Sequence, residues 1–499
     1  MSLNVRNYNN KEMLLFPASI GDYLPKDHLA WVIDEVVNQL GLDCLYKKVP
    51  SVGNPSYHPK MMLKVLFYGY AAFCFSSRKI AKGLESDVAF IFLSGMQQPD
   101  FRTIADFRKN NSEELPKLFI QIVRLCNKLG LIKLSHISLD STVIKANANR
   151  KRSRDKKELL EEEHALKEKI KKLLDSAQSV DDEEDKLFGL TLRGDEIPEE
   201  LRDPKRRLEK IKEAQRLMEE ESLKNINLTD SDATFQKPSD GMVRPGYRAE
   251  IAVDKKEQII ISCDVSNDAN DTEHLVPLIE QATYNLPELS SRKRVVVTAD
   301  SNYSAMESLK KLQSHRNIDA YIPDNKYQAH LNGNKTDEDS PFHKKHFVYN
   351  RRKDIYVCPG GKRLIFSHRK VDTSNRALAV YRCRDCRSCQ HYGICTKSLI
   401  GREIRVYDNI GLIRAMRKKL DTIRGKRIYA KRKAIVEPVF GNIKHNLGFR
   451  QFLLRGLKKV KAEFTLMAIV HNIKKMAKVL RKRVAFKPPG IQLAYFPAT

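Results

Sequence analysis

The stretch Arg294-Val-Val-Val-Thr-Ala-Asp300 decides the fold class of this chain. Its short apolar run is typical of a strand buried in the middle of a sheet. Ser304 and Glu307 follow closely, have the spacing of a capping box and predict a helix that extends to Leu312. A buried strand followed directly by a helix indicates an α/β domain with at least partly parallel pairing, and Asp300 lies at the carboxyl end of the strand.

Further elements of this α/β domain are predicted upstream of the buried strand. The β-prone residues from Ile137 to Ile144 predict a first strand. Two more strands are predicted at Tyr247–Val253 and Gln258–Asp264, and a helix is predicted at Thr272–Gln281. Strands that alternate with helices favour a single sheet with helices packed against it.

The amino-terminal segment 1–130 predicts a separate helical domain. Apolar residues in 28–40 recur on one face of a helix, and Met61–Phe75 is apolar and helical in length. A short basic helix follows, so the arrangement resembles a helix-turn-helix in which Arg78, Lys79 and Lys82 would face DNA. An ordinary helical bundle with solvated cations fits the sequence equally well, and both interpretations remain open.

Three other segments differ from the α/β domain in composition. Residues 156–224 predict two charged helices joined by an acidic loop at Asp181–Asp185, a helical hairpin inserted into the sheet domain. Residues 341–408 contain clustered cysteines and predict a small Cys-rich insertion. Residues 409–499 are helical and basic, with ten Lys or Arg and one acid between Arg414 and Lys433. The α/β core is therefore expected at 131–155 and 225–340, completed by the basic helical segment 409–499.

The charge of the chain indicates a polyanionic partner. Its 499 residues include 90 Lys and Arg against 62 Asp and Glu, a net charge of +28, and nucleic acid is the commonest partner of so basic a protein. The hydrophobic fraction of 41% excludes a disordered or fibrous protein. We read no secretion signal at the amino terminus, and the longest uncharged apolar run, Val65–Phe75, is far shorter than the ~20 residues of a membrane span. We therefore expect a cytoplasmic protein without a membrane partner.

Two aspartates are candidates for phosphoryl-transfer chemistry on DNA. An economical device for this chemistry is two Mg²⁺ ions held ~3.5 to 4 Å apart by a few carboxylates. Asp140 points to the face opposite Leu139 in the first strand, and Asp300 ends the buried strand. Adjacent parallel strands would bring both to one sheet edge, where ligands of α/β domains bind.

A third candidate, Glu437, lies in the basic carboxyl-terminal segment. On a continuous helix, Lys433 and Lys444 would fall within about 40° of Glu437 and could bind phosphates beside a metal-binding acid. Pro438 directly follows the glutamate, so the helix is expected either to start there or to bend. Among the other acids, Asp264 is the most plausible substitute for a member of this triad.

The residues around these acids resemble the DDE transposases of bacterial insertion sequences, whose catalytic core has a ribonuclease H-like fold. The resemblance covers nearly the whole chain. It is carried by Leu139-Asp140-Ser141-Thr142, Gly246-Tyr247 with Ala252-Val253-Asp254, Thr298-Ala299-Asp300-Ser301-Asn302-Tyr303, and Val436-Glu437-Pro438-Val439-Phe440-Gly441-Asn442-Ile443-Lys444.

The resemblance implies a DNA transposase that binds terminal inverted repeats and target DNA in the bacterial nucleoid, as a homodimer on DNA. Asp140, Asp300 and Glu437 would be the catalytic triad and would bind two Mg²⁺ or Mn²⁺ ions for DNA cleavage and strand transfer. Two other readings remain: an inactive or domesticated DNA-binding protein, and a metal-dependent nuclease without strand transfer.

One branch of the family carries a Tyr, x2, Arg, x3, Glu, x6, Lys signature, and the spacings Lys433-x3-Glu437 and Glu437-x6-Lys444 match it. Here Lys433 takes the place of the arginine, while Tyr429 and Arg432 each lie one residue from the expected positions. The resemblance implies that these side chains contact DNA at the cut ends, namely Tyr429, Arg432, Lys433 and Lys444.

The clustered cysteines predict a structural zinc ion. Four thiolates would give the tetrahedral coordination that zinc prefers and would stabilise a small insertion. An iron–sulfur cluster fits less well because five residues separate Cys389 from Cys395 and no proline follows Cys395. Loose surface thiols are the remaining reading, and His391 could also be a ligand. Five cysteines compete for four places: Cys358, Cys383, Cys386, Cys389 and Cys395.

Overall fold

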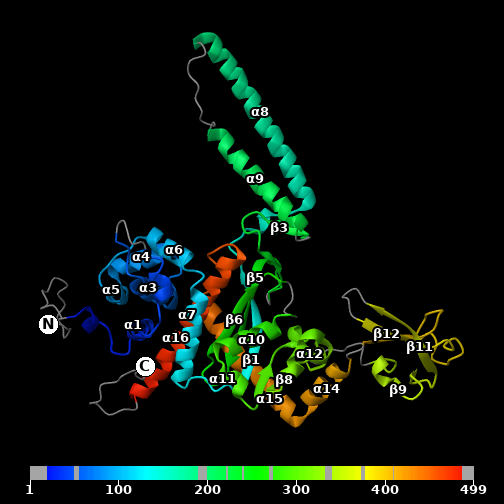
Figure 1. Ribbon diagram of the computed structural model, residues 1–499. Coiled ribbons are helices and arrows are strands. Elements are labelled where there is room, and N and C mark those ends of the chain that lie inside the picture. Colours follow the sequence, from blue (N-terminus) through cyan, green and yellow to red (C-terminus); the bar gives the residue numbers. More distant parts are fainter. Residues whose placement is uncertain are drawn as a thin grey trace, which may run out of the picture.

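The computed structural model describes most of the chain and shows a mixed α/β body with two projecting parts (Figure 1). One part, a pair of long helices, rises from the body, and the other, a small β-sheet, lies at its side. The described residues are 19–49, 55–188, 199–220, 223–238, 241–268, 273–331, 340–371, 377–407 and 410–485.

A six-stranded sheet forms the centre of the body. The first strand, β1 (His136–Lys145), pairs antiparallel with β5 (Arg244–Asp254) and parallel with β7 (Val295–Thr298), which itself pairs parallel with β8 (Ile318–Tyr321). On the other edge of β5, β6 (Ile260–Ser266) and the short β4 (Thr234–Gln236) pair antiparallel with different parts of that long strand. The spatial order is therefore β6, β5, β1, β7, β8, with β4 beyond the start of β5.

Helices cover this sheet and extend its core. The amino-terminal helices pack on the long carboxyl-terminal helix α16, which also contacts β6, so one continuous apolar core reaches from Leu24 to Leu480. The amino-terminal helices are α1 (Leu29–Asn38), α2 (Asp43–Tyr46), α3 (Pro59–Ala71), α4 (Ser77–Ser86), α5 (Val88–Ser94), α6 (Phe101–Asn110) and α7 (Leu115–Lys128). The later ones are α10 (Leu275–Asn285), α11 (Glu288–Ser291), α12 (Met306–Ser314), α13 (Asn325–Leu331), α14 (Ile410–Asp421), α15 (Ile423–Gly441) and α16 (Leu457–Ala485).

Buried polar side chains of α16 fix this helix against the sheet. The side-chain amide of Asn472 accepts a hydrogen bond from the backbone N–H of Ile260 and donates one to its carbonyl, both at 2.9 Å. It thus forms with β6 the pair of hydrogen bonds that a neighbouring strand would form. Next to it, the ring of His471 donates from Nε2 to the carbonyl of Gln258 at 3.0 Å and accepts at Nδ1 from Asn442. These bonds replace the water that the buried groups lose, so they fix where α16 lies along β6.

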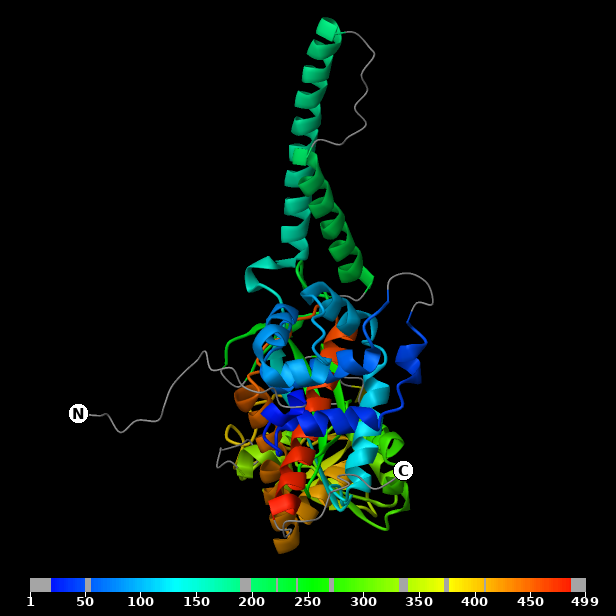
Figure 2. The same cartoon turned by 90° about the vertical axis from the view of Figure 1, so that its left-hand side faces the viewer.

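The inserted hairpin consists of α8 (Lys156–Phe188) and α9 (Glu199–Glu220), which project far from the body (Figure 2). At its base, β2 (Ser153–Asp155) pairs antiparallel with β3 (Asn225–Asn227). The acidic run at 181–185 was expected in the loop between the helices, and that expectation is wrong because α8 continues through it to Phe188. A long helix of good helix-forming residues accommodates the run, and the connection lies outside the described residues.

The Cys-rich segment contains a sheet that the sequence did not predict. Five strands pair antiparallel in the order β13, β12, β11, β10, β9. They are β9 (Val348–Asn350), β10 (Ile355–Val357), β11 (Arg363–Val371), β12 (Ala377–Arg382) and β13 (Glu403–Tyr407). Their own small core is separate from the main one and contains eight buried residues, among them Cys383 and Cys386.

The strands predicted from sequence for the central sheet are confirmed. Ile137–Ile144, Tyr247–Val253 and Gln258–Asp264 correspond to β1, β5 and β6, and the run that ends at Asp300 contains β7. Within the described part of the chain, every helix is either too short or too polar to cross a bilayer.

Two buried histidines predict a loss of stability in acid. Burial lowers the pKa of both His471 and His136 to about 4. Because an unfolded histidine takes up a proton near pH 6.5, unfolding becomes more favourable as the pH falls from about 6.5 to 4, by up to about 3 kcal/mol for each residue. We expect His471→Gln, which keeps a donor for the carbonyl of Gln258, to flatten this dependence when thermal unfolding is followed at several pH values.

The matched control is His164→Gln on the exposed surface of α8. It should leave the pH dependence as it is in the wild type. An equal slope for wild type and His471→Gln would contradict the assignment of a neutral, buried imidazole.

Candidate active site

Asp140, in the middle of β1, and Asp300, just after the carboxyl end of β7, lie level with each other. In the parallel pairing of β1 with β7, Ser138 is opposite Thr298. Asp140 lies two residues after Ser138, and Asp300 lies two residues after Thr298. Side chains alternate along a strand, so Asp140 points to the same face as Ser138. The proximity of the two acids appears in the pKa of Asp140, which burial raises to about 6, with Asp300 adding to the rise.

A polar track runs along the same face below the two aspartates. The hydroxyls of Ser138 and Thr298 are hydrogen-bonded at 2.7 Å, and Nε2 of His136 lies 3.0 Å from the hydroxyl of Thr298. All three side chains are buried. The track ties β1 to β7 through side chains in addition to the backbone ladder, so it holds the two aspartates in register.

Arg432 on α15 is the cation that compensates these acids. Its Nη1 lies 3.3 Å from Oδ2 of Asp140, and its side chain is 10% exposed. The guanidinium counters the rise in the pKa of Asp140. Burial lowers the pKa of Arg432, but Asp140, Tyr429, Asp300 and Glu437 together raise it above its usual value. The negative charges of all three predicted acids therefore act on this one arginine.

Glu437 is exposed on α15, beyond Arg432 along the helix. The helix was expected either to start at Pro438 or to bend there; it does not start there, because α15 runs from Ile423 to Gly441 with this proline inside it. Proline lacks the N–H that would bond to the carbonyl four residues earlier, that of Ala434. The side chain of Gln258 donates to that carbonyl at 3.0 Å, so the helix continues without an unsatisfied group.

The two lysines of the predicted signature occupy different surroundings. Lys433 is exposed on α15, whereas the ammonium of Lys444 donates to the hydroxyl of Thr142 and, at 2.9 Å, to the carbonyl of Val143 on β1. Lys444 lies in a π-helical turn, Asn442–Asn446, and this turn changes the angular spacing from Glu437 that a regular α-helix would give. Lys444 is thus brought to β1, near Asp140.

The sequence placed Lys433 at the arginine position of the signature, but the side chain that enters the acidic site is Arg432. Tyr429 lies close to Arg432 on the same helix. Burial raises the pKa of Tyr429 to about 12; the charge of Arg432 lowers this pKa and that of Asp300 raises it. The hydroxyl of Tyr429 donates a hydrogen bond to Gln328 at 2.8 Å. The signal in the sequence was the intact Tyr429-x2-Arg432 spacing, with one extra residue before Glu437.

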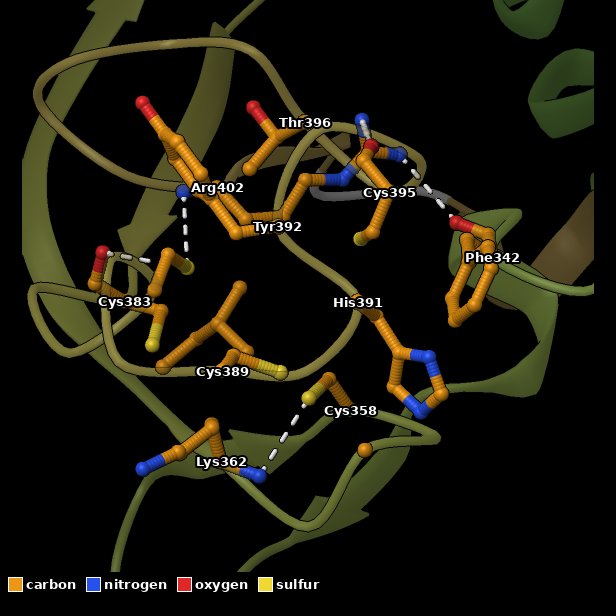
Figure 3. Close-up of a pocket in the computed structure, with 13 residues that line it drawn as sticks. Phe342, Cys358, Lys362, Cys383, Cys389, His391, Tyr392, Cys395, Thr396 and Arg402 are labelled. Atoms are coloured by element: carbon orange, nitrogen blue, oxygen red, sulfur yellow. Dashed lines mark hydrogen bonds between the residues drawn. The ribbon is translucent and has the colours of Figure 1, made fainter.

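The other predicted residues lie elsewhere. Asp264, the possible substitute, pairs with Lys461 at 2.8 Å on the opposite face of the sheet from Asp140. The three cations of α4 are exposed, and the guanidinium of Arg78 lies 5.0 Å from the ring centroid of Phe101. All five clustered cysteines line one pocket of the small sheet (Figure 3). In the described part of the chain, no three His, Cys, Asp or Glu side chains are grouped closely enough to hold a metal ion as they stand.

Two family models match separate parts of the chain. The transposase DDE domain matches residues 357–477, and the transposase domain DUF772 matches residues 18–110. No curated protein matches the chain. A cryo-EM structure of the piggyBac transposase synaptic complex with hairpin DNA shares 10% identity over 91% of this chain and 73% of its own, with a TM-score of 0.31. So low a TM-score does not establish a common fold.

The ion pair in the site predicts a pH-dependent cost for losing Arg432. Arg432→Met leaves the buried carboxyl of Asp140 beside Asp300 without its cation, which should lower the free energy of unfolding by about 3 kcal/mol at about pH 8. A carboxyl whose pKa is raised on folding destabilises the fold above that pKa, so the loss should shrink toward pH 6, where Asp140 takes up a proton. Urea unfolding at the two pH values measures the difference.

Arg427→Met is the matched control, since Arg427 is exposed on the same helix. Adding Asp140→Asn to Arg432→Met should restore most of the stability, because the uncompensated charge is then gone. A double variant no more stable than Arg432→Met would show that the arginine acts through packing instead.

Proposed function

We propose that this chain, which its two family-model matches indicate to be an insertion-sequence DDE transposase, cleaves DNA at terminal inverted repeats and joins the 3′ ends to target DNA. The observation that carries the proposal is the level placement of Asp140 and Asp300 on parallel neighbouring strands, with Arg432 and Glu437 on the helix that crosses them.

The order of the central strands supports a ribonuclease H-like core. Three antiparallel strands in succession, β1, β5 and β6, are followed by two strands parallel to β1 on its other side. The carboxyl end of β7 then lies beside the middle of β1, and ligands of α/β domains bind beyond the carboxyl ends of such parallel strands. The fold family and the residues beside this strand end therefore support each other.

The donor set fits divalent magnesium or manganese. Carboxylate oxygens are the ligands these ions prefer, and Asp140, Asp300 and Glu437 would hold them. When bound, such ions supply charge neutralisation at the phosphate and an activated oxygen nucleophile. Arg432 keeps the acids compensated within the protein, and Asp140 carries a raised pKa that an approaching cation would lower again.

Cations around the acids would hold the DNA backbone. Lys444 and Arg432 lie beside Asp140, and Lys433 is exposed on α15 next to Arg432. Contacts of this kind position DNA without reading its sequence and weaken as salt rises. We propose double-stranded DNA as the partner and a homodimer on DNA, because an element has two ends to be paired.

Replacing a triad member should abolish cleavage without abolishing binding. With labelled DNA from the flanks of the gene, purified wild-type protein and Mg²⁺ or Mn²⁺, we expect nicks at a repeat terminus. Asp140→Ala, Asp300→Ala and Glu437→Ala should each lower the rate by about a thousandfold or more, which corresponds to about 4 kcal/mol. Gel electrophoresis measures cleavage, and a mobility shift measures binding.

Asp264→Asn is the control, since it removes a carboxylate from the opposite face of the same sheet. Retained cleavage in Asp300→Ala would refute the site. Cleavage without joining of 3′ ends to target DNA would favour a nuclease, and tight binding without cleavage by the wild type would favour a DNA-binding protein that has lost activity.

A second set of variants tests whether α4 contacts DNA. Replacing Arg78, Lys79 and Lys82 by Gln should weaken DNA binding at all sequences and reduce the slope of log affinity against log salt by up to about 3, one for each lost phosphate contact. The control replaces three exposed lysines of α8, Lys157, Lys169 and Lys171, by Gln. Equal affinities for both triple variants would favour an ordinary helical bundle.

A further inference from the structure

The Cys-rich module, residues 341–408, has too little apolar core for its size. Its core contains eight buried residues, two of which are cysteines, and it is separate from the main core. Its sequence has 16 Lys and Arg against 5 Asp and Glu, so its charges repel one another. A unit this small usually needs a metal ion or disulfides to fold, and all its cysteines are free thiols.

The thiols converge on one pocket from two parts of the module (Figure 3). Cys358 comes from the turn between β10 and β11, while the others come from the loop between β12 and β13. The sulfurs of Cys358 and Cys389 both lie within 4 Å of the position that a side chain on Gly360 would occupy. Cys386 and Cys395 line the same pocket.

Two of these sulfurs accept hydrogen bonds from the backbone. The N–H of Lys362 donates to Sγ of Cys358 at 3.3 Å, and the N–H of Arg402 donates to Sγ of Cys386 at 3.2 Å. Hydrogen bonds to sulfur are worth more when the sulfur carries a negative charge. The backbone N–H groups of Lys362 and Arg402 would therefore stabilise thiolates at Cys358 and Cys386.

A buried cation beside the thiols also fits a negative centre. Arg402 lines the pocket, and its Nε is buried without a hydrogen-bond partner among the described residues. Its other nitrogens donate to the carbonyls of Cys395 and Phe342. Beside neutral thiols this guanidinium would be poorly compensated, whereas beside a zinc tetrathiolate, with a net charge of −2, it is paired.

Cys383 and His391 have different surroundings. Cys383 is 1% exposed, lies directly after β12 and packs in the small apolar core together with the less deeply buried Cys386. The ring of His391 packs on Phe342, with their centroids 5.0 Å apart. Each of these side chains therefore has a packing role that does not require a metal ion.

We propose that the module holds one structural zinc ion between the thiolates of Cys358, Cys386, Cys389 and Cys395, with Cys383 and His391 outside the coordination shell. Binding replaces four S–H bonds by four Zn–S bonds and releases four protons to solvent. Because Zn–S bonds are about 2.3 Å long, the sulfurs must close around the ion by side-chain rotation from the wider arrangement described above.

The proposal concerns a site separate from the carboxylates, so it stands or falls independently of DNA cleavage. Full-length protein is produced with zinc and dialysed, and its metal content is measured by elemental analysis. We expect about one zinc per chain in wild type, Cys383→Ala and His391→Ala, and most of the zinc lost from Cys358→Ala, Cys389→Ala and Cys395→Ala. Cys44→Ser, in the amino-terminal helices, is the control for losing a thiol elsewhere.

A second measurement keeps the test valid if a variant misfolds. Cobalt replaces zinc in the wild-type protein, and the intensity of its sulfur-to-metal absorption should correspond to four thiolates in tetrahedral geometry. Absence of zinc from the wild type, iron in its place, a spectrum of three sulfurs and one nitrogen, or loss of zinc from Cys383→Ala with retention in Cys395→Ala would each overturn the assignment.

Discussion

The parallel pairing of β1 with β7 is the constraint on which the rest of the structure depends. Its register places Asp140 level with Asp300 although the chain between them contains two long strands, several helices and a long insertion. Parallel neighbours require a crossover, and here β5, β6 and α10 provide it while they complete the sheet. The hydrogen bond between the buried hydroxyls of Ser138 and Thr298 then helps to fix this register. A slip of one residue would turn one aspartate to the other face of the sheet.

Helix α15 supplies the positive charge that offsets the two carboxylates brought together by the pairing of β1 with β7. Burial raises the pKa of Asp140, and repulsion from the nearby carboxylate of Asp300 raises it further. Arg432 offsets part of this cost, but it must reach the strands from a helix that also contains Pro438. The hydrogen bond from Gln258 to Ala434 lets α15 continue through the proline, so Arg432 and Glu437 remain on one continuous helix.

The sequence was sufficient for the strands of the central sheet and for the expectation that the strands of the two aspartates are parallel neighbours. Strand 136–145 and the run before Asp300 have local patterns strong enough to be read directly. Arg432 was harder to place because one residue on a helix changes the direction of a side chain by about 100°, and the π-helical turn before Lys444 makes counting by a regular period unreliable. The small sheet was missed because β9 and β10 have only three residues each, and the longer β11 buries a single side chain and so shows no alternating pattern.

The two insertions leave the central sheet intact because each begins and ends at positions that the body already holds together. The hairpin departs from β2 and returns at β3, which pair with each other. The Cys-rich module departs after α13 and returns at α14, where Arg417 pairs with Asp324 and the hydroxyl of Tyr327 donates to Asp421. The body is therefore closed without either insertion, and neither can draw stability from the main core. The free energy that orders the Cys-rich module against its own positive charge must come from inside the module.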